Sequence, residues 1–319
     1  MNAPLVMAQG RASLTLSHSR AQTIISCGRK YQFRYVERIR PIRSRESLVF
    51  GQMIHKAIAE WLVLRTLGVN DDILSIFARI WTHVRPQEVE WKTFDHHQLG
   101  EIGAVLLEKF ESLWEQLRYR VLVDRRGNPV VEREFSVPIS PTTRYMAIID
   151  VVAVDPQGDI HIIDFKTPSK TSPEGFVGLS HQLLGQQLVV ESNAQEQLGI
   201  DKIRSIGFIE LVKRKISIPK RKTSTRKRKV SASTRVKSVG PQVLFDSTPR
   251  RSQDDIADFI REMQYVALDI QRQRFARRPM DAHNTPCGSM CEYTGLCTKG
   301  DMTGLTRGES FTNRRRSLP

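Results

Sequence analysis

Two strand-forming runs separated by a short turn constrain this chain more than any other stretch. The runs are Tyr145–Val154 and Ile160–Lys166, and the segment between them reads Asp-Pro-Gln-Gly-Asp. Proline and glycine in such a segment favour a turn, so the stretch predicts a β-hairpin. Because both faces of each run carry Ile, Val, Ala or Phe, we expect the hairpin inside a sheet that is covered on both sides.

Three charged residues interrupt this apolar hairpin: Asp150, Asp164 and Lys166. Side chains alternate along a strand, so Asp164 and Lys166 project from the same face. A buried charge is costly unless it is paired or holds a metal. Two carboxylates beside a lysine can bind divalent cations and leave the ammonium close to the reacting atom. A simple ion pair between Asp164 and Lys166 at a strand end is the structural alternative.

The charge balance indicates a polyanionic partner. The formal net charge is +15, and such an excess favours nucleic acid first and an anionic membrane second. From 213 to 237, 12 of 25 residues are basic and none is acidic, which predicts a loop that binds phosphate backbones without sequence preference. Nuclear targeting is the weaker interpretation of this segment. The residues predicted to contact DNA are Arg29, Lys30, Lys213, Lys215, Lys220, Arg221, Lys222, Arg226, Lys227, Arg228 and Lys229.

Several familiar signals do not occur in the sequence. No apolar run reaches the length of a transmembrane helix, so we expect no membrane partner. The N-terminal segment lacks an apolar secretory core, and we expect a cytoplasmic protein. No G-x-x-x-x-G-K-[ST] phosphate loop occurs, so the chain has no recognisable motor of its own. It would act unaided or beside a separate helicase or recombination protein.

The period of the apolar residues predicts helices around the sheet and further strands within it. We expect an α/β fold with a mixed central sheet of about four or five strands, helices on both faces and an N-terminal helical region. The predicted helices cover 20–36, 50–66, 71–83, 97–120, 179–188 and 252–274, and the further strands cover 131–139, 203–213 and 242–245.

Two polar residues outside the hairpin are also candidates for a site. His55 shares the inner face of the helix 50–66 with Ile58 and Leu62, where a histidine is more often a satisfied core residue than a ligand. Glu134 lies with Glu132 on the polar face of the strand 131–139. It is either an outer metal ligand or, the better interpretation, a solvent-facing acid.

Four cysteines complete the set: Cys27, Cys287, Cys291 and Cys297. They are too few and too unevenly placed for a disulfide framework. Clustered thiols in a chain without an export signal favour metal or iron–sulfur ligation.

These signals follow one another in a recognisable order. Cys27 with its basic–aromatic helix comes first, followed by Gly51…His55, Asp150, Asp164-Phe165-Lys166-Thr167, Gln182 and the terminal cysteine triplet. In this order the chain resembles the RecB-type branch of the PD-(D/E)XK nuclease superfamily. More narrowly, it resembles the iron–sulfur members, such as the AddB nuclease domain and CRISPR-adaptation exonucleases. The matching positions span 27 to 297.

The resemblance implies a role for each matching residue. His55, Asp150 and Asp164 would bind one or two Mg²⁺ or Mn²⁺ ions, with the Phe165 backbone carbonyl contributing. Lys166 would position or help activate the attacking water. Gln182 would fix the substrate backbone or Lys166 itself. Cys27, Cys287, Cys291 and Cys297 would ligate a [4Fe–4S] cluster, with Zn²⁺ as the chemical alternative.

The sequence departs from the family pattern in three places. Gln186 stands where the Q-x-x-x-Y motif has its tyrosine, which puts an aromatic contact to DNA in doubt. Ala147 replaces a glycine that often precedes the second-motif aspartate. The spacing C-x3-C-x5-C is one residue longer than the usual C-x2-C-x5-C. None of these changes removes a metal ligand.

We therefore expect one nuclease domain over 13–297 that hydrolyses DNA exonucleolytically on single strands or duplex ends. It would serve DNA repair and recombination, or phage or CRISPR DNA processing. The alternatives are a DNA-binding scaffold with a vestigial site and a structure-specific endonuclease. Within the domain we expect a helical region at 49–125, a catalytic core at 130–215 and 241–282, a basic loop at 213–240, and a cysteine staple joining 27 to 283–297. Residues 1–12 and 298–319 are predicted to be disordered.

Overall fold

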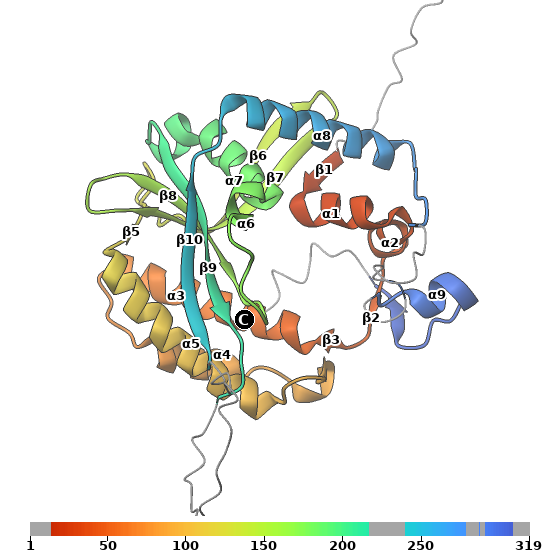
Figure 1. The fold of residues 1–319 in the computed structure, drawn as a ribbon, viewed down its shortest axis with the longest axis horizontal. Coiled ribbons are helices and arrows are strands. Elements are labelled where there is room, and N and C mark those ends of the chain that lie inside the picture. The colour runs from red at the N-terminus through yellow and green to blue at the C-terminus, as the bar shows by residue number, and fades with distance from the viewer. Residues whose placement is uncertain (1–13, 217–239, 279–286, 288–290, 309–319) are drawn as a thin grey trace, which may run out of the picture.

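A seven-stranded mixed sheet organises the computed structural model, with the strand order β1-β7-β8-β9-β10 and with β5 and β6 also paired to β7 (Figure 1). The structure describes residues 14–216, 240–278, 287 and 291–308. The predicted four or five strands were too few, because β1 and β5 are too short to give a periodic signal. The strands of this sheet are β1 (Leu14–Ser17), β5 (Arg120–Val121), β6 (Val131–Ser140), β7 (Thr143–Val154), β8 (Ile160–Lys166), β9 (Ile203–Val212) and β10 (Gln242–Pro249).

The predicted hairpin is confirmed. Strands β7 and β8 run antiparallel, with Val154 opposite Ile160. The turn is closed by Asp155, whose carboxylate accepts hydrogen bonds from the backbone N–H groups of Gln157 at 2.9 Å and Asp159 at 2.8 Å. Such side-chain-to-backbone bonds are the reason that Asp is favoured in turns. Strand β9 then pairs parallel to β8 and places Phe208 beside Asp164.

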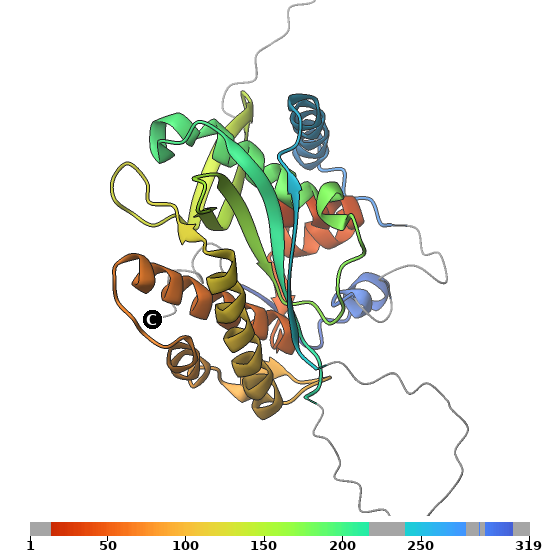
Figure 2. The ribbon, with the colours of Figure 1, turned by 60° about the vertical axis from the view of Figure 1, so that its left-hand side comes forward.

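Helices cover both faces of this sheet, as predicted (Figures 1 and 2). Residues of α3, α4 and α5 build one core with the face of the sheet that carries Phe165, whereas α7 and α8 build another with the face that carries Phe208. Capping boxes at Asp95 and Ser252 begin α5 and α8. The helices are α1 (His18–Ser26), α3 (Glu46–Thr66), α4 (Ile73–Trp81), α5 (His96–Leu117), α6 (Phe176–Leu179), α7 (His181–Ser192) and α8 (Gln253–Gln271). Of these helices, none is both long and apolar enough to cross a bilayer.

The helix predicted over 20–36 is interrupted. It divides into α1, α2 (Gly28–Tyr31) and a π-helical turn (Gln32–Val36), with Cys27 in an extended conformation at the break. Close packing explains the break, since a Cβ added at Gly28 would lie 2.8 Å from the backbone of Phe275 and of Ala276. The cysteine therefore lies at a corner of the chain and not inside a continuous helix.

A small third core lies at the side of the molecule, formed by Phe33, Ile39 and Tyr293. We call the part of the chain that builds it, 27–41 and 291–308, the cysteine module. Its C-terminal part was predicted to be disordered from 298 onward, but 298–308 is ordered because Met302 and Leu305 pack on this core. The module contains α2, β2 (Ile39–Pro41), α9 (Thr294–Lys299) and β11 (Leu305–Arg307), and β2 pairs antiparallel with β11.

Two further strands, β3 (Ser44–Arg45) and β4 (Val89–Glu90), pair parallel beside α3. Glu46 begins α3 there, and its buried carboxylate accepts hydrogen bonds from the backbone N–H groups of Lys92 at 2.6 Å and Thr93 at 3.0 Å. This contact fixes the start of the helix that carries His55. Two short helical turns, Pro86–Glu88 and Ala194–Leu198, complete the ordered elements.

Candidate active site

The candidate site lies at a fork in the sheet. The ladder between β7 and β8 extends only from Val154 to Val151, which pairs with Ile163. On the same side of β7, the parallel ladder with β1 ends where Ser17 lies opposite Met146. Within the strands that the structure describes, residues 147–150 of β7 thus have no strand partner on this side. Asp150 and Asp164 are the first residues beyond the hairpin ladder, so the fork brings the two carboxylates to one place.

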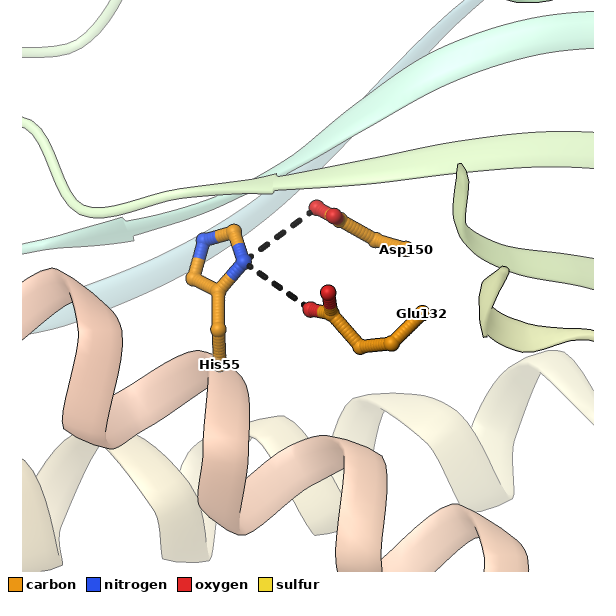
Figure 3. A group of neighbouring side chains, drawn as sticks. All are labelled: His55, Glu132 and Asp150. Carbon is orange, nitrogen blue, oxygen red and sulfur yellow. Dashed lines mark ion pairs between the residues drawn. The ribbon is translucent and has the colours of Figure 1, made fainter. Parts of the chain in front are cut away.

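Three side chains from three different elements converge at the fork (Figure 3). One nitrogen of His55, on α3, lies 3.4 Å from a carboxylate oxygen of Asp150 on β7 and 3.7 Å from one of Glu132 on β6. The three potential ligand atoms all lie within 4.8 Å of one another. Neighbouring donors of this kind are what a divalent cation requires.

Gly51 allows α3 to bring His55 close to Asp150 at the fork. A Cβ added at Gly51 would lie 3.0 Å from Oγ1 of Thr167, the residue after Lys166. The helix can therefore approach the end of β8 closely. This contact gives a physical reason for the sequence spacing between Gly51 and His55.

Glu132 is the functional candidate that the sequence analysis missed. It was assigned to the polar face of its strand, and its side chain is 40% exposed. Its backbone φ is +47°, a left-handed value that is rare for a non-glycine residue and rarer inside a strand. The register of β6 with β7, Val131 opposite Val151 and Arg133 opposite Ile149, places Glu132 across from Asp150. A register shift between Pro138 and Ser140 hides this neighbour from the sequence, because pairing extended from the turn would place Glu132 opposite Val151.

A second group of polar side chains holds Asp164 and Lys166. The amide of Gln182, on α7, accepts a hydrogen bond from Nζ of Lys166 and donates one to Oδ1 of Asp164, both at 2.7 Å. Gln186, one turn further along α7, donates to the same Oδ1 at 2.7 Å. Gln186 is buried, at 1% exposure. Gln186 stands at the tyrosine position of the Q-x-x-x-Y motif, and in this chain its amide holds the carboxylate of Asp164.

The other oxygen of Asp164 is a buried atom without a hydrogen bond in the described part of the chain. The Lys166 ammonium lies 2.5 Å from it in an ion pair, but not with the angles of a hydrogen bond. The ammonium compensates the charge of this oxygen, whose lone pairs keep the capacity to bind a second cation. The gathered donor set of His55, Glu132 and Asp150 fits a divalent metal ion, and Asp164 lies one residue beyond the hairpin ladder beside Asp150.

The backbone of Phe165 joins the two sides of the fork. Its N–H group donates to Oδ2 of Asp150 at 2.7 Å, and its ring meets the His55 ring edge to face, with centroids 5.9 Å apart. The predicted ligation of a metal by the Phe165 carbonyl remains a prediction.

The electrostatics of the site follow from its burial and from its concentration of acids. Burial, followed by the neighbouring carboxylate of Asp164, raises the pKa of Asp150 to about 6. Burial alone would lower the pKa of His55. Its contacts with Asp150 and Glu132 outweigh that effect and raise the pKa to about 10. The fork thus attracts positive charge to the position between His55 and the carboxylates of Asp150 and Glu132.

His18 is a second residue near the site that the sequence analysis did not select. It begins α1, and burial, followed by the Lys166 ammonium, lowers its pKa to about 4. The imidazole is therefore neutral near pH 7. No feature of the sequence distinguishes His18 from an ordinary first residue of a helix.

The cysteines lie far from the sheet interior. None of the four forms a disulfide in the described part of the chain, and all four are partly buried. Cys291 and Cys297 pack against the core of the cysteine module, and Cys287 is close enough to Cys291 to influence its thiol. Burial is the main cause that raises the pKa of Cys291. Across the residues that the structure describes, no three cysteine sulfurs gather within 4.8 Å of one another.

The residues predicted to contact DNA separate into three groups. Lys213 is buried, and its ammonium donates to the carbonyl of Thr167 at 2.7 Å, so it has a structural contact and its contact with DNA stays a prediction. Lys30 pairs with Glu292 at 3.2 Å, and Arg29 donates to Gln32 at 2.8 Å, so both have structural contacts. Lys215 stays a prediction. Lys220, Arg221, Lys222, Arg226, Lys227, Arg228 and Lys229 lie outside the described residues.

Comparison with known proteins identifies the family. The family described as PD-(D/E)XK nuclease superfamily matches residues 15–298. No curated protein matches the chain. Among solved structures, it is similar to a protein from Eubacterium rectale provisionally named an exonuclease, with 11% identity, coverage of 95% of this chain and 94% of that one, and a TM-score of 0.44. It is also similar to the structure named SSO0001, with 11% identity, coverage of 68% and 72%, and a TM-score of 0.26.

Neither of these two structural likenesses is close enough to support an argument, and the assignment rests on the family match. That match extends from β1 to α9 and includes His55, Asp150, Asp164 and Lys166. The chain belongs to the PD-(D/E)XK nuclease superfamily.

Proposed function

We propose that this chain is a metal-dependent deoxyribonuclease of the RecB type that degrades single-stranded DNA or duplex ends from a terminus. The observation that carries the proposal is the convergence of His55, Glu132 and Asp150 within 4.8 Å at the fork where Asp164 and Lys166 also lie. The net charge of +15 supports a polyanionic substrate.

The residues at the fork would hold one or two Mg²⁺ or Mn²⁺ ions through His55, Glu132, Asp150 and the Asp164 oxygen that pairs with Lys166. Such an ion, when bound, supplies Lewis-acid polarisation of the scissile phosphate and a water of lowered pKa. The protein contributes the orientation of these donors. Asp164 is fixed by two glutamine amides, and Asp150 by the Phe165 N–H group.

Lys166 completes the arrangement. Its ammonium is held between Gln182 and Asp164, and the side chain remains 35% exposed. It can therefore donate a hydrogen bond to a phosphate oxygen or to the attacking water. Gln182 orients the lysine, which is one of the two roles that the family resemblance implied.

The test is degradation of end-labelled single-stranded DNA with Mg²⁺ or Mn²⁺, comparing anaerobically purified wild type with Asp164→Ala. Glu134→Ala is the matched control, since Glu134 is an exposed acid two residues from Glu132 on the same strand. Metal-dependent loss of label in wild type and control, but not in Asp164→Ala, would support the nuclease. Resistance of circular single strands would support the exonuclease. Binding without cleavage by all three proteins would favour a scaffold with a vestigial site.

We further propose that Cys27, Cys287, Cys291 and Cys297 ligate a [4Fe–4S] cluster with a structural role. Support comes from the packing of Cys291 and Cys297 on one small core and from the corner in the chain at Cys27. Zn²⁺ is the alternative, and its thiolate sulfurs would need to lie about 4 Å apart around Zn–S bonds of about 2.3 Å. Iron and acid-labile sulfide in anaerobically purified protein would decide for the cluster, and stoichiometric zinc against it.

The basic segment 213–237 would hold DNA through phosphate contacts, although most of it lies outside the described residues. Its removal should weaken binding and flatten the dependence of binding on salt. Unchanged affinity would argue against that role. A separate helicase or recombination protein remains the partner that we expect, for DNA repair, recombination, or phage or CRISPR DNA processing.

A further inference from the structure

A cavity of about 310 Å³ opens beside Lys166. Lys166 and Thr167 form its border with the fork, and Pro168, Phe176 and Phe208 form an apolar wall. Ligand pockets range from about 300 to 1,000 Å³, so this one has room for a small flat group and not for a folded duplex. It lies along β9, on the side of Lys166 away from the β7–β8 hairpin ladder.

The wall of the cavity contains an unusually exposed aromatic ring. Phe176, the first residue of α6, is 43% exposed. It stacks on Phe208 at 6.2 Å between ring centroids with an interplanar angle of 23°. Lys166 Nζ lies 5.3 Å from the Phe208 ring centroid. Because one face of the Phe176 ring stacks on Phe208, the other face is available to a planar group. This face lies beside the Lys166 ammonium, which is proposed to contact phosphate.

The polar border of the cavity is acidic. Glu210 is buried at 6% exposure, and its carboxylate accepts hydrogen bonds from the N–H group of Ser172 at 3.0 Å and from the Ser172 hydroxyl. A carboxylate has about four lone-pair sites, so these two bonds leave capacity for the N–H groups of another partner. The same negative charge opposes the entry of a phosphate. The chemistry therefore favours a neutral planar ring with N–H donors.

We propose that this cavity binds one unpaired nucleobase of the substrate strand, next to the phosphate at Lys166. The inference rests on the proposed function and specifies its substrate, because a base that enters the cavity cannot be paired with a complementary strand. Bases that are already unpaired enter such pockets at the lowest cost. Stacking on Phe176 would give affinity without strong sequence preference, as aromatic platforms for single strands do.

Binding in EDTA tests the cavity without cleavage. The probes are a fluorescein-labelled single strand of deoxythymidines and the same strand with abasic sites in place of its bases. We expect wild type to bind the strand with bases about five- to one-hundred-fold more tightly than the abasic strand, as the loss of stacking predicts. Phe176→Ala should lose most of this difference, and Phe176→Trp should restore it.

Leu179→Ala is the matched control, because Leu179 is 77% exposed on the same helix but does not line this cavity. It should keep the full preference for bases. Unchanged preference in Phe176→Ala, or no preference in wild type, would overturn the inference. Thermal melting of each variant shows that the exposed substitutions leave the protein folded.

The two proposals can fail separately. Metal-dependent cleavage by wild type without a preference for bases would leave the nuclease and remove the nucleobase cavity. A preference that depends on Phe176, in a protein that cuts no DNA with either metal, would leave the cavity and remove the nuclease.

Discussion

The fork in the sheet and the cysteine module both join distant parts of the chain, but they are supported differently. The fork lies between the two large hydrophobic cores, and its polar groups are held by hydrogen bonds such as those from Gln182 and Gln186 to Asp164. The module has a core of only three buried side chains, Phe33, Ile39 and Tyr293, with Tyr31 buried beside it, and a ladder of three residue pairs between β2 and β11.

This difference separates the uses of metal at the two sites that we propose. A site built on a complete core is formed before its ion arrives, so the ion adds chemistry more than stability. A segment with a core as small as that of the module gains its order from a crosslink or a bound metal. We therefore expect substitutions at the fork to reduce activity with little unfolding, and substitutions at the cysteines to release structure.

The strongest test of this contrast is Asp164→Asn, which keeps the shape of the side chain and removes the charge. Loss of a proposed metal ligand reduces the stabilisation of the transition state by several kcal/mol, so the rate of cleavage should fall about a thousandfold or more. The melting temperature should change little. Kinetics with labelled DNA and thermal melting measure the two effects. A large drop in melting temperature would contradict the view that the fork is formed without its ion.

The opposite result is expected for Cys27→Ala. Removing one of four proposed ligands should abolish the iron content and release the segment from 291 onward, so that limited proteolysis of this segment becomes about tenfold faster or more. Binding of Mn²⁺ at the fork should persist. Full iron content and unchanged proteolysis would remove the cysteine staple.

Two neighbouring glutamines of α7, Gln186 and Gln187, offer a matched pair of substitutions. Gln186→Leu deletes one amide that orients Asp164, and the loss of such an orienting contact typically costs 10- to 100-fold in metal affinity or activity. Gln187→Leu is the control, because Gln187 is equally buried but bonds to Arg251 and Glu191. Titration with Mn²⁺ should show weaker binding in Gln186→Leu alone. Equal effects of both substitutions would indicate a general loss of packing.

The smallest expected effect is that of Tyr293→Phe in the module. The Tyr293 hydroxyl donates to the Ile39 carbonyl at 2.8 Å, and removing this buried bond should cost about 1 kcal/mol. Hydrogen exchange at the amides of β2 and β11 should become faster, while cleavage stays unchanged. Tyr265→Phe, at a 63% exposed position of α8, should alter neither measurement.

The hairpin and most of the helices around it were accessible from the sequence, because apolar period and turn residues determine them locally. Asp150, Asp164 and His55 were selected as proposed ligands through the order of motifs that the family resemblance supplied. Glu132 was not, because its role depends on pairing across β6 and β7 and on a left-handed backbone that no local pattern announces. The burial of Lys213 was hidden by its position at the start of a basic segment. The order of 298–308 depends on contacts with Phe33 and Ile39, more than 250 residues earlier.

The hydrogen bond from the Phe165 amide to Asp150 crosses a seam between two halves of the sheet. Asp150 belongs to β7, which pairs with β6, whereas Asp164 and Lys166 belong to β8, which pairs with β9. Among the strands that the structure describes, no ladder joins β7 to β8 beyond Val151. An ion bound by carboxylates of both halves would hold the two halves of the sheet together. The hydrogen-exchange rate of the Phe165 amide proton would then report how strongly a bound ion holds the two halves of the sheet together.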